Sequence, residues 1–315
     1  MLGMDRASPL PRLGLPEGDN IEMNHHVERS GELAPRAAAS SLPSGSVASQ
    51  LRTAGYAVFR DVLPPARIDR LRSVVRAHLQ AHGRPNYGGR YDLRGMNRQP
   101  ELARTLCGDE IVRVMKACTS PELPVLTGEC DLMADTTSGW HKDITDDMRL
   151  GPSLLFQEDF RVYKLAVYLQ DQPEDSRLTL KVRPGTHRIM DGSGIAPTPL
   201  AVRAGDVLVF DVRLDHAGQI PTLPERLAHR AALRVAPLLG MDAEAAYTRA
   251  RRAARALTGR GRSRLAVFMT FGPDSPALHA YERSGRHRHG PVPAELDRSA
   301  AAALAAGGVG IIQAG

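Results

Sequence analysis

Cysteine is scarce in this chain: its 315 residues include only Cys107, Cys118 and Cys130. Their spacing contains no Cys-x-x-Cys pair and no Cys/His finger pattern, which argues against a disulfide scaffold and against structural zinc. An odd set of unpaired cysteines is typical of a reducing compartment. A chain of this length buries a substantial core without such cross-links.

Long apolar runs are also missing. No stretch of about 18 apolar residues occurs, as a membrane-spanning helix would require. The first part of the chain carries Asp5, Glu17, Asp19 and several prolines where a secretory signal would need apolar residues. The sequence therefore predicts a soluble, cytoplasmic protein that does not enter a membrane.

Aromatic residues make up only 4% of the chain, which is few for stacking on nucleic-acid bases. The net charge is +6, but the arginines are spread over many segments, including an Ala/Arg-rich stretch from 243 to 257. This distribution is typical of a solvated basic surface. We therefore expect no nucleic-acid partner.

Residues 1 to 44 are rich in Pro, Ala, Ser and Gly and show no sustained periodicity, which predicts a flexible arm. One domain is expected from 45 to 290, followed by a tail from 291 to 315. The first part of this domain is predicted to contain a helix at 47 to 53, a strand at 56 to 60, and helices at 65 to 82 and 100 to 118.

The later part of the domain contains short β-type runs separated by Gly, Pro and Asp. Strands are predicted at 125 to 133, 161 to 169, 178 to 182, 206 to 210 and 265 to 271. A helical insertion, about 222 to 259, interrupts this series. The pattern predicts a mainly β fold with flanking helices and a jelly-roll or cupin-like core.

His141 and Asp143 are the first candidate metal ligands. On a strand, residues i and i+2 point to the same face, so this pair presents an imidazole nitrogen and a carboxylate oxygen to one ion. His216 follows the buried run 207 to 211 and supplies a second histidine. Two histidines and one carboxylate leave open positions on an octahedral ion, as in oxygen-activating Fe(II) sites, whereas zinc prefers a closed or tetrahedral set.

Five motifs occur in an order that resembles the phytanoyl-CoA dioxygenase family of 2-oxoglutarate oxygenases over about residues 50 to 285. The motifs are GYAVF at 55 to 59, His141-x-Asp143, YLQD at 168 to 171, LKVRPGTH at 180 to 187, and Gly205-Asp206 leading to His216-Ala217-Gly218. The resemblance implies a double-stranded β-helix, Fe(II) as the metal, and 2-oxoglutarate and O₂ as co-substrates. It also implies that His187, in its Pro-Gly-Thr-His turn, is structural.

Members of that family bind the distal carboxylate of 2-oxoglutarate with an arginine on the strand after the second histidine. Here Arg230 and Arg264 compete for that role. Arg230 falls in the predicted helical insertion, whereas Arg264 opens the predicted strand at 265 to 271. An arginine suits this role because it forms a bidentate pair with a carboxylate. We favour Arg264 because it lies on a strand, as the family pattern requires, with the helical insertion occupying the gap after His216.

Lys164 is a charge inside an apparent core strand, where burial without a partner is costly. Two interpretations stay open: it binds a co-substrate or substrate anion, or it reaches solvent or pairs with Glu129 or Asp131. The polar stretch from 144 to 158 is predicted to be a lid.

The resemblance implies decarboxylation of 2-oxoglutarate to succinate and CO₂, coupled to hydroxylation of a C–H bond in a small molecule, in keeping with bacterial secondary metabolism. Epimerisation, desaturation and cyclisation by the same oxidant are alternatives. Asp143 argues against halogenation, for which relatives replace the carboxylate. Two other classes are a non-catalytic β-helix protein that binds a small ligand and a cupin-type metal hydrolase or isomerase.

Overall fold

The computed structural model describes residues 44–144, 157, 159–258, 263–289 and 296–312. The predicted arm, apart from Ser44, and nearly all of the predicted lid therefore lie outside the described residues. None of the described helices is long and apolar enough to cross a membrane.

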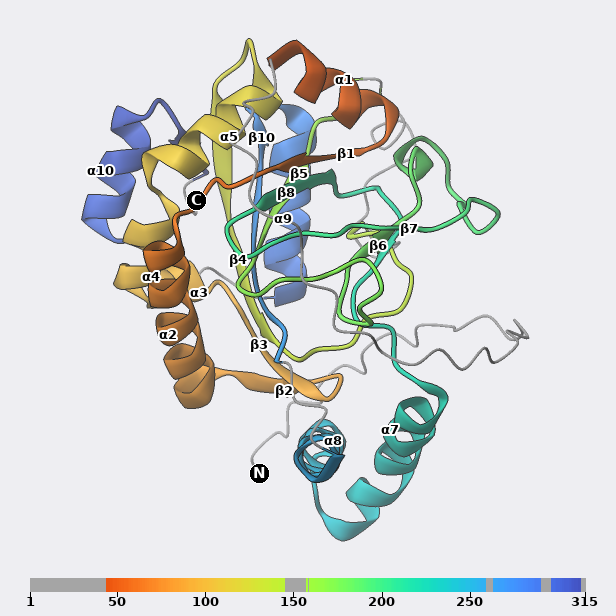
Figure 1. The fold of residues 1–315 in the computed structure, drawn as a ribbon. Helices are drawn as coiled ribbons and strands as arrows, with labels where there is room; N and C mark the ends of the chain where they lie inside the picture. Colours follow the sequence, from red (N-terminus) through yellow and green to blue (C-terminus); the bar gives the residue numbers. More distant parts are fainter. Residues whose placement is uncertain (1–43, 145–156, 158, 259–262, 290–295, 313–315) are drawn as a thin grey trace, which may run out of the picture. The chain divides into compact units, whose positions relative to one another are not determined.

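The elements of the first half are mainly helical (Figure 1). They are α1 (Ser44–Thr53), β1 (Tyr56–Phe59), α2 (Pro65–His82), β2 (Arg84–Asn86), β3 (Gly89–Leu93), α3 (Gly95–Arg98), α4 (Pro100–Leu106), α5 (Asp109–Thr119) and β4 (Pro124–Ala134).

The second half supplies the remaining described strands. Its elements are β5 (Tyr163–Tyr168), β6 (Lys181–Val182), the 3-10 turn η2 (Thr186–Arg188), β7 (Thr198–Pro199), β8 (Val207–Asp211), β9 (His216–Ala217), α7 (Leu223–Val235), η3 (Ala236–Leu239), α8 (Ala243–Thr258), β10 (Leu265–Pro273), α9 (Pro276–His289), α10 (Arg298–Ala306) and β11 (Gly310–Ile311).

Within the described residues the strands form two sheets. The larger has eight strands in the order β1-β8-β5-β10-β4-β3-β2, with β11 beside β4, and the smaller has the order β7-β6-β9. All of these pairings are antiparallel except that of β11 with β4. This architecture is the mainly β fold with flanking helices that the sequence predicted.

The pleat of the larger sheet separates two environments. Alternate residues of β5, Leu165 and Val167, pack in a core cluster that also contains the buried faces of α1, α2, α4, α5 and α10. Ala166 and Tyr168 point to the other face and pack with residues of the smaller sheet. Since successive side chains of a strand face opposite ways, the space between the sheets receives every second residue.

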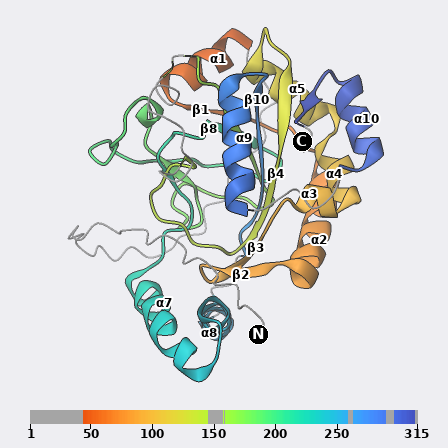
Figure 2. The same cartoon turned by 180° about the vertical axis from the view of Figure 1, so that it is seen from behind.

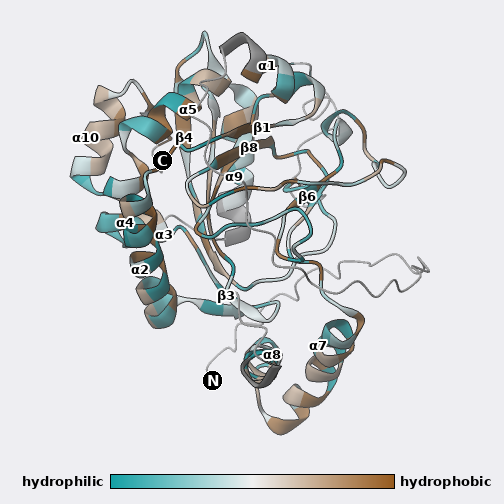
Figure 3. Cartoon of the chain, viewed as in Figure 1, coloured by the Kyte–Doolittle hydropathy of each residue, from teal (hydrophilic) through white to brown (hydrophobic). Residues whose placement is uncertain are grey.

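Helix α2 shows how the helices cover the outer face of the large sheet. Its Pro65 occupies the first turn, where a missing N–H is tolerated. The predicted apolar face, Ile68, Leu71, Val75 and Leu79, is buried as expected. Figure 3 shows hydrophilic and hydrophobic residues alternating along this helix. Helix α9 lies on the opposite side, in front of β10 and β4 in Figure 2.

Several sequence predictions need correction. The single helix expected over 100 to 118 is two helices, because Gly108 is extended and serves as the N-cap residue of α5. The hairpin β2–β3 and helix α9 were not predicted. The stretch expected as a tail contains α10, whose Leu304 is in the main core, and β11, which pairs with β4.

The predicted helical insertion is present as α7 and α8. Thr222 and Glu225 form a reciprocal capping box at the start of α7, which satisfies free backbone N–H groups there. Arg251 of α8 pairs with Glu225 at 2.8 Å and also donates to the carbonyl of Gly88 in the β2–β3 turn. The insertion is therefore attached to the sheet by specific polar contacts.

The packing of α10 predicts a large effect of truncating its buried leucine. Leu304 is 0% exposed and Leu238, in η3, is 83% exposed. Leu304→Ala should lower the free energy of unfolding by about 2–5 kcal/mol because it leaves a cavity. The matched change Leu238→Ala should alter it by less than about 0.5 kcal/mol. Urea denaturation measures both, and equal small effects would show that α10 adds nothing to the core.

Candidate metal centre

Backbone pairing brings the two predicted histidines together. His141 and His216 form an antiparallel bridge in which the N–H of each donates to the carbonyl of the other, at 3.0 and 2.9 Å. The N–H of Asp143 donates to the Val212 carbonyl at 2.9 Å. His141 and Asp143 therefore lie on an irregular segment rather than on the regular strand expected, yet hydrogen bonds hold both in register with the β8–β9 connection.

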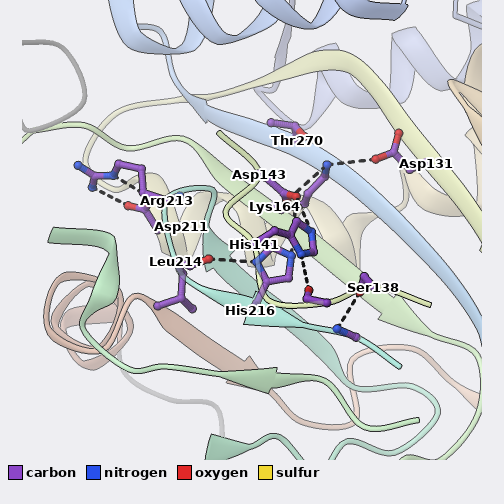
Figure 4. A network of polar contacts seen from close by, with 12 residues as sticks. Asp131, Ser138, His141, Asp143, Lys164, Asp211, Arg213, Leu214, His216 and Thr270 are labelled. Atoms are coloured by element: carbon purple, nitrogen blue, oxygen red, sulfur yellow. Dashed lines mark hydrogen bonds and ion pairs between the residues drawn. The ribbon is translucent and has the colours of Figure 1, made fainter. Parts of the chain in front are cut away.

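Their side chains converge on one point (Figure 4). Oδ1 of Asp143 lies 3.6 Å from Nε2 of His141 and 3.7 Å from Nε2 of His216. One potential ligand atom from each of the three residues lies within 4.8 Å of the others. The predicted triad is thus assembled in the structure with the spacing that a single ion needs.

The second nitrogen of each imidazole has a backbone partner. Nδ1 of His141 lies 2.8 Å from the Gly139 carbonyl, and Nδ1 of His216 lies 3.0 Å from the Leu214 carbonyl. A carbonyl only accepts, so each Nδ1 carries the proton and each Nε2 keeps its lone pair. This arrangement is the one that metal-binding histidines adopt.

Burial keeps His216 neutral. Its pKa falls from 6.5 to about 4, chiefly because the buried imidazolium loses its hydration and also because His141 lies beside it. His141 is more open, with 38% of its side chain exposed. Both observations suit a metal ligand, since the imidazole must be deprotonated at Nε2 and one side of the centre must admit other ligands.

Lys142 connects the two segments that carry the triad. Its side chain points away from His141 and Asp143, and its Nζ donates to the carbonyls of Thr186 and Arg213, each at 2.7 Å. It also pairs with Asp215 at 3.2 Å, the residue before His216. The ammonium therefore ties the His-x-Asp segment to the connection that precedes the second histidine.

Lys164 points into the space between the sheets and lies among carboxylates. Its Nζ is 3.1 Å from Asp131, 3.6 Å from Asp143 and 3.7 Å from Glu129. Pairing with Glu129 and Asp131, one of the two open interpretations, is therefore confirmed. The ammonium is directed to protein carboxylates, which favours a role behind the triad over binding of a co-substrate anion.

The carboxylates around Lys164 lie close enough to one another to interact unfavourably. Burial raises the pKa of Asp131 to about 6 against the lowering effect of Lys164, and the neighbouring Glu129 raises it further. Glu129 comes close to Lys164 because β4 bulges opposite Thr270 of β10. The triad thus lies beside a buried region in which carboxylates outnumber ammonium groups, an environment that favours a cation.

Arg264 and Arg230 have opposite environments. Arg264 precedes β10, is 4% exposed and donates from Nη2 to the Tyr168 hydroxyl at 3.3 Å. A Cβ at Gly218 would lie 3.1 Å from both terminal nitrogens of Arg264, so the guanidinium fits against the chain just after His216. Arg230 is exposed on α7. The structure brings Arg264, and not Arg230, to the triad's side of the sheet.

His187 is buried but does not join the triad. Its Nε2 lies 3.1 Å from the Arg52 carbonyl, and a Cβ at Gly55 would lie 2.6 Å from its Nδ1. Gly55 has a φ of 83°, a conformation that side chains disfavour. The structural role predicted for this turn agrees with these contacts.

Sequence reasoning did not identify Ser138 as a partner of Gly218 or Tyr168 as a neighbour of Arg264. Ser138 Oγ accepts from the Gly218 N–H at 2.9 Å, and the Tyr168 ring centre is 5.2 Å from the Arg264 guanidinium carbon. Ser138 precedes the His-x-Asp pair closely, and Tyr168 lies in a predicted strand, but neither position by itself indicates a contact with a residue far along the chain.

No protein-family model matches the chain, and no curated protein matches it. Among solved structures it is similar to HygX from Streptomyces hygroscopicus with nickel and 2-oxoglutarate bound, at 17% identity and a TM-score of 0.50, covering 73% of this chain and 86% of that one. The likeness establishes the fold.

Two further solved structures come from nogalamycin biosynthesis. The α-ketoglutarate-dependent carbocyclase SnoK is 16% identical with a TM-score of 0.49, covering 72% of this chain and 82% of that one. The epimerase SnoN in complex with Fe³⁺, α-ketoglutarate and nogalamycin RO is 14% identical with a TM-score of 0.48, at the same coverages of 72% and 82%.

The geometry predicts which residues are needed to bind a metal. His141→Ala, Asp143→Ala and His216→Ala should each weaken Fe(II) binding by more than about 100-fold, because changes in outer-shell partners alone already cost about 10- to 100-fold. His187→Ala is the control and should bind Fe(II) as the unaltered protein does. Anaerobic titration with Fe(II) measures each affinity, and retained binding in a triad variant would contradict the assignment.

Proposed function

We propose that the chain is an Fe(II)- and 2-oxoglutarate-dependent oxygenase that oxidises a C–H bond of a small molecule. One observation carries the proposal: the guanidinium of the buried Arg264 lies beside Gly218, two residues after His216 of the triad, with no carboxylate partner among the described residues. The triad accounts for the metal, and the arginine accounts for a second, anionic ligand beside it.

Burying a guanidinium without a counter-ion is costly, and arginines in protein interiors are normally paired. In the described part of the chain Arg264 contacts the hydroxyl and ring of Tyr168, and its Nε has no hydrogen-bond partner. A ligand carboxylate would supply the missing charge through a bidentate pair. A dicarboxylate such as 2-oxoglutarate fits, because its other end is available to chelate a metal at the triad.

The donor set favours iron over structural zinc. Two imidazoles and one carboxylate oxygen form the facial arrangement of non-haem Fe(II) oxygenases, with positions left open. A metal held there would, with 2-oxoglutarate and O₂, supply the oxidising chemistry that yields succinate and CO₂. In this chain the two Nδ1–carbonyl contacts orient the imidazole rings, and Arg264 would bind the co-substrate carboxylate.

The sequence motifs support a more specific proposal for the family and the reaction. The ordered set from residue 55 to 218 supports membership of the phytanoyl-CoA dioxygenase-like family, and HygX shows that a protein of this fold holds nickel and 2-oxoglutarate together. Asp143 occupies a ligand position that halogenation would leave vacant. Hydroxylation is the reaction we propose, with epimerisation, desaturation and cyclisation as alternatives, because the three metal ligands do not determine the fate of the oxidised substrate.

Uncoupled turnover tests the proposal directly. The protein should release succinate when Fe(II), ascorbate and 2-oxoglutarate are added under air, and the rate should fall to background in His216→Ala. Anaerobic binding of 2-oxoglutarate should require the metal. If the Fe(II)-loaded protein neither binds 2-oxoglutarate nor forms succinate, the proposed function is wrong.

The two arginines provide a matched pair of variants. Arg264→Ala should weaken apparent affinity for 2-oxoglutarate by roughly 30- to 1000-fold, the equivalent of about 2–4 kcal/mol for leaving a buried carboxylate unpaired. Arg230→Ala should change it little because Arg230 is exposed. Arg264→Lys should recover only part of the loss, since an ammonium lacks the planar fork. The 2-oxoglutarate dependence of succinate release decides between the two.

A further inference from the structure

The two oxygens of the Asp143 carboxylate have different neighbours. Oδ1 faces the histidines, 3.6 Å from Nε2 of His141 and 3.7 Å from Nε2 of His216. Oδ2 faces the other way and lies 3.6 Å from Nζ of Lys164 (Figure 4). One oxygen is thus directed to the candidate metal position and the other to a buried ammonium.

The Lys164 ammonium is held in place from behind. It extends from β5, where its neighbours across the sheet are Thr270 of β10 and Phe210 of β8. Its side chain is only 10% exposed and pairs with Asp131 at 3.1 Å and Glu129 at 3.7 Å. Because β5 is a central strand with both neighbours paired, the lysine has little freedom to leave this position.

Glu129 is fixed in turn by two hydroxyl groups. Its Oε2 accepts from the Thr270 hydroxyl at 2.9 Å and from the Tyr281 hydroxyl of α9 at 3.3 Å. The order of contacts runs from α9 and β10 through Glu129 to Lys164 and then to Asp143. A chain of contacts anchored at both ends restricts the orientation of the last carboxylate.

We propose that Lys164 is a positioning residue that keeps Asp143 a one-oxygen ligand, so that a coordination position stays open. This inference rests on the proposed function. If Oδ2 were free, the carboxylate could turn and bind the metal through both oxygens. The ammonium opposes that turn because the ion pair with Oδ2 would be lost.

The number of protein atoms bound to the metal decides how many coordination positions are left for other ligands. An octahedral ion with two imidazoles and one carboxylate oxygen has three positions left, enough for a chelating 2-oxo acid and O₂. With both carboxylate oxygens bound, the chelating acid would fill the remaining two and O₂ would have none. Lys164 would therefore determine whether the centre can react, without touching either co-substrate.

The experiment counts water molecules on bound Mn(II), an octahedral ion whose exchangeable waters are measured by water-proton relaxation. No 2-oxoglutarate is added. The unaltered protein should show three waters, and Lys164→Arg, which keeps the charge, should also show three. Lys164→Met should show two, because the ion pair that opposes the turn of the carboxylate is lost.

A double variant separates positioning from stability. Lys164→Met alone leaves Asp131 and Glu129 buried with no cation, which threatens folding. Lys164→Met with Asp131→Asn removes one charge of each sign, so the balance of buried charge is kept while the ion pair between Lys164 and Oδ2 is still absent. A merely structural lysine would be compensated and show three waters, whereas a positioning lysine would still show two.

Asp92→Asn is the matched control for breaking a buried ion pair. Asp92 pairs with Leu132 across β3 and β4, so it faces the helices rather than the triad, and it contacts His78 at 2.6 Å. This variant should melt at lower temperature and keep three waters. Three waters in the double variant, or two in the unaltered protein, would overturn the role of Lys164. Failure of the unaltered protein to bind either Mn(II) or Fe(II) would instead remove the proposed metal centre.

Discussion

Two backbone hydrogen bonds between His141 and His216 are the contact on which the centre depends. They join a segment after β4 to the connection after β8, so the two histidine rings lie 4.2 Å apart between centroids. The side chains then need only their ordinary geometry to converge with Asp143. Lys142 reinforces this junction from the opposite side through the carbonyls of Thr186 and Arg213.

The pleat of the large sheet determines which chemistry reaches that junction. On β5 and β10 the residues facing the helices are apolar, and they form the main core with α2, α4 and α5. The opposite faces of the same strands, and of their neighbour β4, carry Lys164, Thr270 and Asp131. Such polar groups are costly to bury singly. They occur together because each satisfies another, and they form a polar group beside the centre on an otherwise apolar face.

Arg264 lies directly before the first residue of β10. Its backbone N–H and carbonyl both pair with Asp135, which has a φ of 58°. Arg255 of α8 also pairs with the Asp135 carboxylate at 2.9 Å. The helical insertion and the buried arginine therefore share one anchor, which explains how a long insertion is accommodated without displacing the strand that follows it.

Local sequence was sufficient for much of this protein. Alternation and apolar periodicity predicted the main strands, α2 and the fold class, and the residues His141, Asp143 and His216 were identifiable from their order along the chain. These features depend on side-chain type and short spacing, which a single sequence contains. The two-residue strand β11 and the hairpin β2–β3 were missed because such short segments form only when β4 is there to pair with.

Only the tertiary structure showed that Arg264 is buried near Gly218 while Arg230 is exposed, and that Lys164 lies among carboxylates. All three are charged residues in segments with clear secondary structure, and local pattern does not show whether an opposite charge lies within reach. The partners of Lys164 come from β4 and from the segment after it, brought together by sheet pairing and the bulge opposite Thr270. The environment of a buried charge is set by residues distant in sequence, so the role of each cation depended on the fold.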